Sequence, residues 1–482
     1  MNETTANSME SKTGSIKTEE VVFIRKQTES SGGYDVFSLQ EYVEDGRRPF
    51  ALARVQVTDV APDLLNSVLV EQVPEYLRDG PSRKVHVLVS TGAGTGRALA
   101  FYEAALKPLL DTLGFTSSEG GNGPSAQAES DNRGNRYNLV ITKDAQSIRQ
   151  FAQDLNEGGP EQEAIEIDHT VILLSGDGGI VELLNGKAPT DGGSRTQTRT
   201  PLVAVLPLGT GNALFNSLHK PVKAAGGPAA PPSGLVQGLR TLLTGAAAPL
   251  PSFEAAFSPS SRLITYVSDN GEEADKAEER ADAVSHLRGA IVASYGFHSQ
   301  LVWESDTPAY RAHGAKRFGM VAQELLRESH AYSAEVEITT PGEKERKRVE
   351  RDRHAYVLAT LVSNLEETFT ISPASRPLDG GLRLVHFGDV GGERTMDIMM
   401  RAYDGGRHVD MRWAGEGGGG PEERVGYDEI AEVRVTTLER DPRWRKVCVD
   451  GTIVEMPQGG SMTVTVEEEA HLRILVDRLI VS

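Results

Sequence analysis

Between Lys84 and about residue 248, short apolar runs alternate with stretches whose apolar residues recur at helical spacing. The first helical stretch follows the run at 85–89 and places five leucines on one face: Leu99, Leu106, Leu109, Leu110 and Leu113. Further apolar runs occur at 138–142, 170–174 and 202–206. Strands that alternate with helices are typical of a parallel sheet covered on both faces. We therefore predict a Rossmann-like α/β domain over residues 84–248.

After about residue 249 the apolar positions follow a period of two, in segments such as LITYVS, AIVASY and YVLATLVS. Many short strands of this kind predict an antiparallel β-sandwich domain over residues 249–482. Helical spacing interrupts the strands near 310–328 and 396–403. The C-terminal part is thus expected to be rich in β-structure.

The N-terminal residues do not continue the α/β pattern. Residues 1–20 are polar and are expected to form a disordered tail, whereas the runs at 21–25 and 50–57 read as strands. We predict a β-rich extension over residues 21–80. Inserts rich in Gly, Pro, Ser and charge interrupt the later sequence and are expected to be surface loops: 117–136, 188–200, 222–234, 258–282, 341–353 and 414–423.

Charge and cysteine content narrow the function classes. The 482 residues include 50 Lys plus Arg against 69 Asp plus Glu, a formal charge of −19. An acidic chain is a poor partner for nucleic acid, because binding the phosphate backbone needs a cationic surface. The single cysteine, Cys448, excludes an intrachain disulfide and a zinc site built from cysteines. We expect a reducing, cytoplasmic location.

No apolar run approaches the roughly 18 residues of a membrane span, and residues 1–20 lack the apolar core of a secretory signal. Any membrane association is therefore expected to be peripheral. The basic run at 343–354 could contact anionic lipid headgroups, but acidic residues interleave it. A solvated hairpin loop is the favoured interpretation of that run.

The segment SGDGGIVELLNG, residues 175–186, follows a buried apolar run and opens into a helix. Gly176, Gly178 and Gly179 permit close approach of a ligand, so that their amides can form an anion-binding concavity. Asp177 lies among them at the carboxyl end of a strand, where open α/β sheets bind ligands. The alternative is a tight strand-to-helix turn capped by the aspartate.

A second turn of the same kind occurs in PLVAVLPLGTGNALFNSL, residues 201–218. Gly209, Thr210, Gly211 and Asn212 offer amide N–H groups, a hydroxyl and a side-chain amide at the start of a helix. One glycine-rich turn is weak evidence for a phosphate site, whereas two on successive strands of one sheet are moderately specific. The pair predicts a ligand that carries phosphates.

These two segments resemble the catalytic domain shared by diacylglycerol kinases, ceramide kinases and sphingosine kinases. The later segments YGFHSQLVWES, YRAHGAKRF and VDGTIVE add to the likeness, which covers about residues 84–467 and is greatest to the sphingosine and ceramide kinase branch. The resemblance implies a nucleotide-binding α/β domain and a lipid-binding C-terminal domain. It implies transfer of the γ-phosphate of ATP, with Mg²⁺, to the hydroxyl of a long-chain lipid met transiently at a membrane surface.

The resemblance also implies roles for particular residues. Asp177 would be the general base on the lipid hydroxyl, Gln300 would contact the lipid, and Asp450 would close the site near the metal-bound phosphates. Two cations of the C-terminal part, Arg311 and Arg317, would offset phosphate charge. The nucleotide would be lined by Thr142, Gly176, Gly178, Gly179, Glu182, Gly209, Thr210, Gly211 and Asn212. The residues that would bind the metal itself are not identified.

Three departures from the family pattern bear on these roles. Where the family has Asn-Pro and a lysine in its first glycine-rich turn, this chain has Ser90, Thr91 and Thr95, which leaves Arg97 as the candidate to supply the charge. Gln300 stands where sphingosine kinases carry an aspartate that reads the lipid amine. Because a neutral amide cannot balance a buried ammonium, a neutral lipid alcohol is favoured. Thr452 replaces the acidic residue of the family's DGE turn.

Other function classes are kept beside the lipid kinase. The departures at Ser90, Thr95 and Thr452 allow a catalytically weak or inactive relative that binds lipid or nucleotide as a scaffold, although retention of Asp177 favours an enzyme. An NAD kinase or phosphofructokinase relative fits the GTGNAL segment less well, and the turn at 92–96 lacks the GxGxxG spacing of a dehydrogenase. The histidines show no metal-ligand spacing, so His298, His313 and His354 are expected to be packing or surface residues. The acceptor lipid and the oligomeric state stay open.

Overall fold

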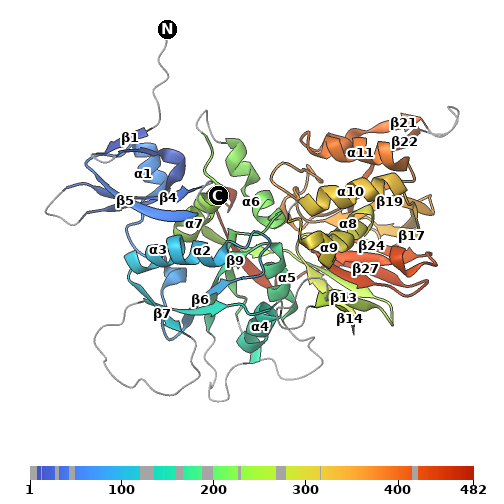
Figure 1. The fold of residues 1–482 in the computed structure, drawn as a ribbon, viewed down its shortest axis with the longest axis horizontal. Coiled ribbons are helices and arrows are strands. Elements are labelled where there is room, and N and C mark those ends of the chain that lie inside the picture. Colours follow the sequence, from blue (N-terminus) through green and yellow to red (C-terminus); the bar gives the residue numbers. More distant parts are fainter. Residues whose placement is uncertain are drawn as a thin grey trace, which may run out of the picture. The chain divides into compact units, whose positions relative to one another are not determined.

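A computed structural model of the chain divides into two compact units (Figure 1). The first unit comprises residues 1–210, 219–249 and 472–482, and the second comprises 211–218 and 250–471. The structure describes residues 8–11, 14–27, 32–42, 49–119, 135–144, 146–157, 167–186, 199–225, 230–267, 278–314, 316–414 and 422–481. Much of the predicted loop inserts, at 120–134, 187–198, 268–277 and 415–421, lies outside the described residues.

A seven-stranded sheet organises the first unit. The parallel pairs are β7–β8, β8–β6, β6–β9, β9–β10 and β10–β28. The predicted parallel-sheet α/β fold is confirmed. The strands lie in the order β11 (Ala246–Leu250), β28 (Leu472–Val476), β10 (Leu202–Pro207), β9 (Asp168–Ser175), β6 (Arg83–Val89), β8 (Asn135–Ile141) and β7 (Phe115–Glu119).

Side chains that alternate along β6 show that helices cover both faces of this sheet. Val85, Val87 and Val89 belong to one buried cluster with residues of the helices α2, α3 and α7. On the other face, the ring of His86 lies 5.0 Å from that of Phe151 on α4 (centroid to centroid). The helices of this unit are α2 (Ala98–Phe101), the π-helical turn η3 (Tyr102–Leu106), α3 (Lys107–Thr112), α4 (Ser147–Glu157), α5 (Asp177–Asn185), α7 (Gly234–Thr244) and α12 (Arg478–Val481). Helix α6 (Ala213–Ala225) belongs to the second unit up to residue 218 and to the first unit from residue 219.

One predicted leucine face is interrupted. Leu106, Leu109, Leu110 and Leu113 are buried, but Leu99 is 37% exposed. The helix passes through the π-helical turn η3 between Leu99 and the other leucines. A π-turn holds more residues than an α-turn, so it rotates the preceding residues away from the buried face.

The N-terminal extension forms a three-stranded antiparallel sheet, β3 (Val21–Lys26), β4 (Tyr34–Glu41) and β5 (Phe50–Val57). Phe23, Phe37 and Phe50 of this sheet pack into the same core as the leucines of α3 and α7. Arg240 of α7 donates to the carbonyl oxygens of Val21 and Thr18 at 2.7 and 2.8 Å. The extension also contains β1 (Ser8–Ser11), β2 (Gly14–Lys17), η1 (Thr18–Glu20), α1 (Pro62–Val68) and η2 (Glu75–Leu77), so the stretch expected as a tail holds a β-hairpin.

The second unit is built on a 14-stranded sheet of antiparallel pairs, which confirms the predicted antiparallel β-architecture. Its main path runs β14 (Glu278–Ala283), β13 (Arg262–Val267), β26 (Thr452–Glu455), β25 (Lys446–Val449), β16 (Val292–Gly296), β19 (Arg353–Thr360), β17 (Tyr332–Thr339), β24 (Glu432–Thr437), β27 (Ser461–Val466), β12 (Phe253–Phe257) and β15 (His286–Gly289). Off this path lie β18 (Lys347–Arg348), β20 (Leu382–Gly388) and β23 (Gly426–Ile430), and β21 (Arg412–Ala414) pairs separately with β22 (Glu422–Arg424).

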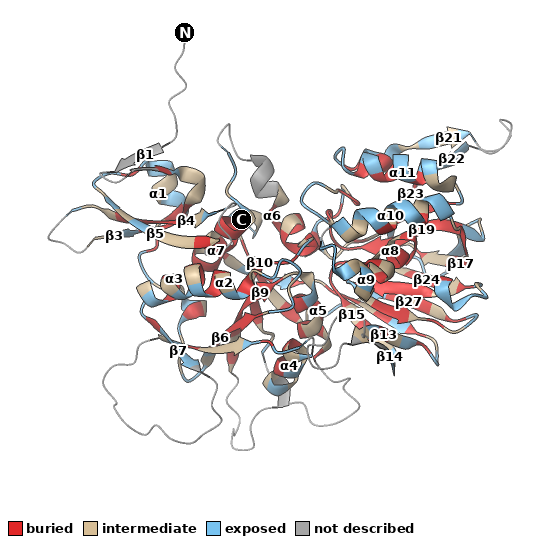
Figure 2. Cartoon of the chain, in the orientation of Figure 1, coloured by how far each residue is buried: buried red, intermediate tan, exposed pale blue. Residues whose placement is uncertain are grey.

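Helices of the second unit expose part of their surface and bury the rest (Figure 2). They are α8 (Phe297–Ser305), α9 (Pro308–Arg311), α10 (Lys316–Glu328) and α11 (Gly391–Ala402), with short 3-10 turns η5 (Pro377–Asp379), η6 (Arg407–Asp410) and η7 (Pro442–Trp444). The helices expected near 310–328 and 396–403 are present. Across the part of the chain that the structure describes, no helix combines the length and the apolar character that a membrane crossing requires.

Candidate functional site

Four strand ends meet at the carboxyl edge of the first unit's sheet. The amide of Leu208 after β10 donates to the carbonyl oxygen of Ser175 at the end of β9 (3.1 Å). Ser90 after β6 is joined in the same way to Leu174 (3.0 Å), and Thr142 after β8 to Val89 (2.9 Å). The turns that follow these strands therefore begin side by side, at the edge where α/β sheets bind ligands.

The turn from β9 to α5 presents Asp177 at a helix start. Gly176 caps α5, and Asp177 is its first residue and is half-buried. A side chain at Gly179 would approach Ser175 to 2.8 Å, whereas one at Gly178 would meet no protein atom within 4 Å. Gly179 thus fits the tight turn, and Gly178 leaves open space beside Asp177. The positive end of α5 favours negative charge at this point, whether carboxylate or phosphate.

The turn from β10 to α6 has a backbone conformation that few residues adopt. Asn212 has a φ of 52°, in the left-handed region, which asparagine tolerates better than most residues. The side chain of Asn216 donates to the carbonyl oxygen of Gly211 (2.9 Å), and the Asn216 amide donates to that of Asn212 (2.9 Å). Thr210 is exposed at the tip of the turn. These bonds fix the backbone of the segment from which we expected phosphate contacts.

The first glycine-rich turn packs directly on this second one. The hydroxyl of Thr95 donates to the carbonyl oxygen of Leu208 at 2.5 Å. A side chain at Gly94 would collide with the Thr210 hydroxyl, so only glycine fits there. The Thr95 side chain therefore joins the two glycine-rich turns through a hydrogen bond. Arg97, the candidate to replace the missing lysine charge, holds its guanidinium carbon 4.4 Å from the centre of the Phe50 ring.

Two residues expected to line the nucleotide already have protein partners. The buried hydroxyl oxygen of Thr142 accepts from the Thr91 amide (2.9 Å), and the Thr91 hydroxyl donates to the Thr142 carbonyl oxygen (2.9 Å). Glu182 on α5 pairs with Arg149 on α4, with 2.9 Å between Oε2 and Nε. Burial raises the pKa of the Glu182 carboxyl, and the Arg149 charge opposes that rise. Sequence reasoning missed Thr91 and Arg149 as partners because nothing local to either residue indicates the contact.

The structure brings Arg311 and Arg317 together within the second unit. Both approach one carboxylate, that of Asp306: Arg311 through two hydrogen bonds of 3.0 and 2.6 Å, and Arg317 at 3.7 Å. The hydrogen bonds to Asp306 raise the pKa of Arg311. Nε of Arg317 is buried and has no hydrogen-bond partner among the described residues. Asp306 thus holds the two guanidinium groups near each other.

Asp450 has a different environment. Its carboxylate accepts hydrogen bonds from three consecutive backbone amides, Ala290 (2.6 Å), Ile291 (3.1 Å) and Val292 (2.6 Å), and the residue is 7% exposed. Its own φ is 46°, and Gly451 follows at 88°. In this structure the Asp450 carboxylate therefore holds the backbone of residues 290–292, which leads into β16. Thr452, the third departure from the family pattern, is the first residue of β26.

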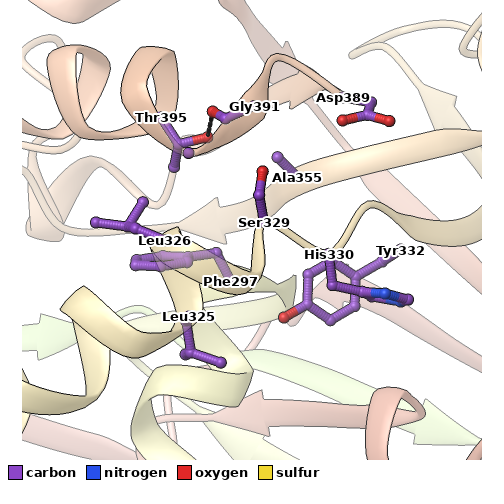
Figure 3. Close-up of a pocket in the computed structure, with 11 residues that line it drawn as sticks. Phe297, Leu325, Leu326, Ser329, His330, Tyr332, Ala355, Asp389, Gly391 and Thr395 are labelled. Atoms are coloured by element: carbon purple, nitrogen blue, oxygen red, sulfur yellow. Dashed lines mark hydrogen bonds between the residues drawn. The ribbon is translucent and has the colours of Figure 1, made fainter.

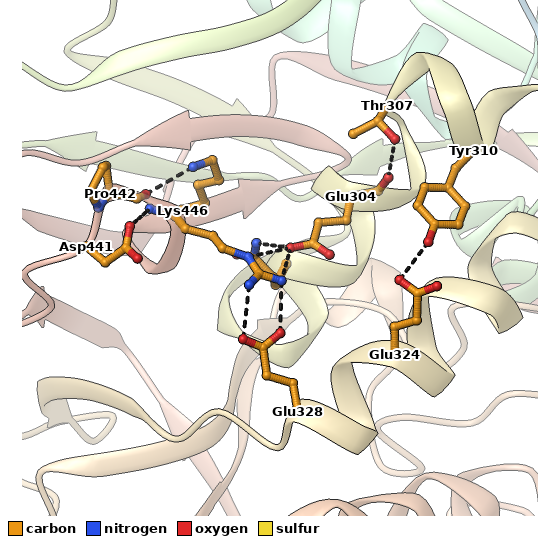
Figure 4. A network of polar contacts seen from close by, with 10 residues as sticks. Glu304, Thr307, Tyr310, Glu324, Glu328, Asp441, Pro442 and Lys446 are labelled. Atoms are coloured by element: carbon orange, nitrogen blue, oxygen red, sulfur yellow. Dashed lines mark hydrogen bonds and ion pairs between the residues drawn. The ribbon is translucent and has the colours of Figure 1, made fainter.

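Gln300 is held in a polar network on α8. Its Nε2 donates to Oε1 of Glu304 (2.7 Å), while its own Oε1 is buried without a hydrogen-bond partner among the described residues. Glu304 also pairs with Arg443, which binds Glu328 on α10 through two further bonds of 3.0 Å (Figure 4). The network fixes the orientation of the Gln300 amide and leaves its oxygen as an acceptor.

A mainly apolar pocket lies in the second unit where α8, α10, β17, β19 and α11 approach one another (Figure 3). The volume of this cavity is only about 20 Å³, so side chains must move before it can admit a long hydrocarbon chain. Its walls combine apolar and polar groups: Phe297, Leu325, Leu326, Ser329, His330, Tyr332, Ala355, Asp389, Gly391, Gly392 and Thr395. No residue of this pocket was singled out from the sequence, because its walls come from separate segments.

Histidines and the basic run behave as expected. His313 is exposed, His354 is fully buried, and His298 is half-buried with its Nδ1 2.7 Å from the Ser294 hydroxyl. The run at 343–354 contains β18, which pairs with β17. Four of its cations have carboxylate partners: Arg346 with Glu432, Lys347 with Glu343, Arg348 with Glu335 and Arg353 with Asp389. The paired charges fit a solvated hairpin.

Metal ligands do not gather at one point in the described part of the chain, where no group of three or more His, Cys, Asp or Glu could hold an ion. The glycine turns at the carboxyl edge, with Gly178 open beside Asp177, fit a nucleotide phosphate chain. A magnesium ion that arrives with a nucleotide takes many of its ligands from the phosphates, so the residues present fit that group.

One known domain family matches part of the chain. Residues 84–231 match the diacylglycerol kinase catalytic domain, and no curated protein matches the chain. A solved diacylglycerol kinase from Bacillus anthracis is similar at 13% identity, with a TM-score of 0.45, covering 83% of this chain and 100% of its own. A second structure assigned as a diacylglycerol kinase of that organism shares 14% identity, with a TM-score of 0.47, covering 83% of this chain and 99% of its own. At such TM-scores these likenesses carry no weight beyond the domain match.

Proposed function

We propose that this chain, which carries a diacylglycerol kinase catalytic domain at residues 84–231, transfers the γ-phosphate of ATP to the hydroxyl of a neutral long-chain lipid. The observation that carries the proposal is the carboxyl edge of the first unit's sheet. There two glycine-rich turns leave the hydrogen-bonded ends of β9 and β10, and Asp177 opens α5. Backbone amides beside one carboxylate are what phosphoryl transfer to an alcohol requires.

Phosphoryl transfer passes through a loose transition state, so the protein mainly positions groups and offsets charge. In the proposed reaction Asp177 accepts the proton of the lipid hydroxyl, while amides of Gly176 and Gly178 bind phosphate oxygens. The amide of Gly179 donates instead to the carbonyl oxygen of Gly176 (3.1 Å) and so supports the turn. Mg²⁺ bound with ATP would neutralise part of the phosphate charge. Arg311 and Arg317 share Asp306 in the second unit, and the role that the resemblance implies for them, offsetting phosphate charge through planar donors, stays a prediction.

The surroundings of Gln300 support a neutral acceptor. Its orphaned Oε1 can accept a hydrogen bond from a hydroxyl or amide, but it carries no charge to balance an ammonium. The neighbouring carboxylate, Glu304, is already paired with Arg443. A buried ammonium would therefore lack a counter-ion, which is costly. The apolar walls of the pocket at Phe297 and Leu326 suit the hydrocarbon part of such a lipid.

Substitution of Asp177 tests the reaction. We expect Asp177→Asn to lower turnover roughly a hundredfold or more in mixed micelles with ATP and magnesium, since a general base contributes about that factor. The matched control is Asp154→Asn, an exposed residue of α4 whose carboxylate accepts a hydrogen bond from Gln150 (2.9 Å), and this variant should retain full activity. Equal turnover of the Asp177 variant and the wild type would remove that residue from its proposed role.

Side-by-side assays with sphingosine, ceramide and diacylglycerol test the acceptor class. We expect the two neutral lipids to be phosphorylated in preference to sphingosine, because Gln300 offers no negative charge. A strong preference for sphingosine would contradict this assignment, and Gln300→Asp measured in parallel shows whether charge at this position alters the preference.

The second candidate function is a nucleotide- or lipid-binding scaffold with little turnover. The contact that favours it is the bond from Thr95 to Leu208, because a residue of the first glycine turn serves there to hold the backbone instead of binding phosphate. Measurable binding of ATP to the wild-type protein, with no transfer to any of the three lipids, would favour the scaffold.

A further inference from the structure

Helix α11 has a wider apolar surface than its own unit covers. Thr395, Ile398 and Ala402 are buried, and Met399 is 9% exposed. Around the helix from them lie Met396 (39% exposed), Met400 (56%) and Tyr403 just past the helix end (46%). The spacing of four and three residues places these three side chains on one face. The apolar arc thus continues beyond the buried stripe into solvent.

Aromatic side chains extend this exposed face. The ring of Tyr403 lies 4.8 Å from that of Phe369 in an edge-on contact (centroid to centroid). Near the other end of the helix, the guanidinium of Arg394 lies 6.0 Å from the Trp413 ring on β21. Tyrosine and tryptophan combine an apolar body with a polar tip, the composition found where proteins meet the headgroup region of a bilayer. We call Met396, Met400, Tyr403 and Phe369 the α11 face.

The same helix forms part of the apolar pocket. Gly391, Gly392 and Thr395 of its first turns line the pocket together with Leu326 of α10. A side chain at Gly392 would collide with the carbonyl oxygen of Leu326, so the two helices touch through the glycine. One helix therefore carries both a wall of the pocket, in its first turns, and an exposed apolar face.

Charges on α11 balance. Glu393 and Asp397 oppose Arg394 and Arg401, and both guanidiniums approach Asp397, at 3.8 and 3.7 Å. The whole chain has a formal charge of −19 and is repelled by an anionic surface. Glu366 adds a carboxylate that is hydrogen-bonded to Tyr403, so the α11 face carries no excess of positive charge. An apolar face of this kind suits a zwitterionic lipid surface better than an anionic one.

We propose that the α11 face contacts the surface of a lipid bilayer and lets the lipid alcohol reach the pocket from it. The occupant is the zwitterionic headgroup region, into which Met396, Met400 and the two aromatic rings insert. The delivery of a lipid alcohol to the pocket rests on the proposed lipid kinase function, whereas the binding of the α11 face to a bilayer does not require catalysis.

Sedimentation with vesicles of pure phosphatidylcholine, without ATP or acceptor lipid, tests the surface. We expect the wild type to bind, and Met396→Glu with Met400→Glu to weaken binding at least about tenfold, because burying a methionine contributes more than that factor in affinity. Met400→Trp should strengthen binding. Each variant is also sedimented without vesicles, so that aggregated protein is not counted as bound. The matched control, Leu438→Glu, alters an apolar residue of the same unit that is 48% exposed and should bind like the wild type.

Three outcomes would overturn the proposal. The first is equal binding by the wild type and the double variant. The second is binding that needs phosphatidylserine and disappears in high salt, since apolar insertion is nearly independent of salt. The third is a wild-type dimer in solution that the double variant abolishes, which assigns the face to a second copy of the chain. Phosphotransfer in mixed micelles is measured separately, so that an inactive protein that still binds vesicles refutes the kinase and leaves this surface standing.

Discussion

Two Asp-Gly dipeptides show how differently the same residues can be used. Asp177 and Gly178 are the first two residues of α5. Asp177 is half-buried and Gly178 is exposed, and a side chain at Gly178 would meet no protein atom within 4 Å. Asp450 and Gly451 both have positive φ, and the Asp450 carboxylate is surrounded by the amides of residues 290–292. In the first dipeptide the glycine has open space around it, whereas in the second the aspartate stabilises the backbone. The family resemblance assigned both aspartates to the site, and only three-dimensional contacts separate their surroundings.

Replacement of Asp450 should therefore act on stability. In Asp450→Asn the side chain keeps one acceptor oxygen and turns an NH₂ group towards buried amides. We expect a loss of about 2 to 4 kcal/mol in the free energy of unfolding, because charge-assisted hydrogen bonds are lost and amides are left unsatisfied. Urea denaturation measures this change, with Asp404→Asn on the exposed surface as the control. If stability stays unchanged and the affinity for ATP falls, Asp450 acts at the nucleotide as the resemblance implies.

At the scale of elements, the sequence predicts what depends on local pattern. The parallel strands β6, β8, β9 and β10 were found from their apolar runs, and so were most strands of the second unit. The pairing of the last strand, β28, with β10 was not found, because its five residues carry no local sign of their partner. The exposure of Leu99 was missed for a related reason: the π-helical turn that displaces it depends on packing around Tyr102, whose hydroxyl lies 2.9 Å from that of Tyr137.

The candidate site divides in the same way. The glycine turns were visible in the sequence because strand, glycines and helix are consecutive. The ties between turns, such as Thr95 to Leu208, join residues 113 positions apart and need the folded sheet. The polar network of Gln300, Glu304 and Arg443 likewise depends on α8 meeting the turn η7. Sequence patterns therefore located the site, whereas its supporting contacts required coordinates.

Four histidines with a lowered pKa make the stability of the whole molecule depend on pH. Burial lowers the pKa of His298, His354 and His408 to about 4 and that of His86 to about 3, from an ordinary value of 6.5. Between pH 6.5 and 4 the unfolded chain therefore binds protons that the folded chain does not. Stability is fully present above pH 6.5 and is lost as the pH falls towards 4, by about 1.4 kcal/mol for each histidine and each pH unit in that window.

The second unit should lose most of this stability, since it holds His298, His354 and His408, whereas the first holds His86. The three tryptophans of the chain, Trp303, Trp413 and Trp444, also belong to the second unit, so intrinsic fluorescence reports on it alone. We expect urea midpoints measured by fluorescence to fall steeply between pH 7 and pH 5, and His354→Phe to remove about one proton from that dependence. Glu467, whose pKa is about 2, loses its contribution only below its ordinary 4.5, so it does not contribute in this range. A urea midpoint that stays constant from pH 7 to pH 5 would contradict this prediction, because it would mean that the folded unit binds as many protons as the unfolded one.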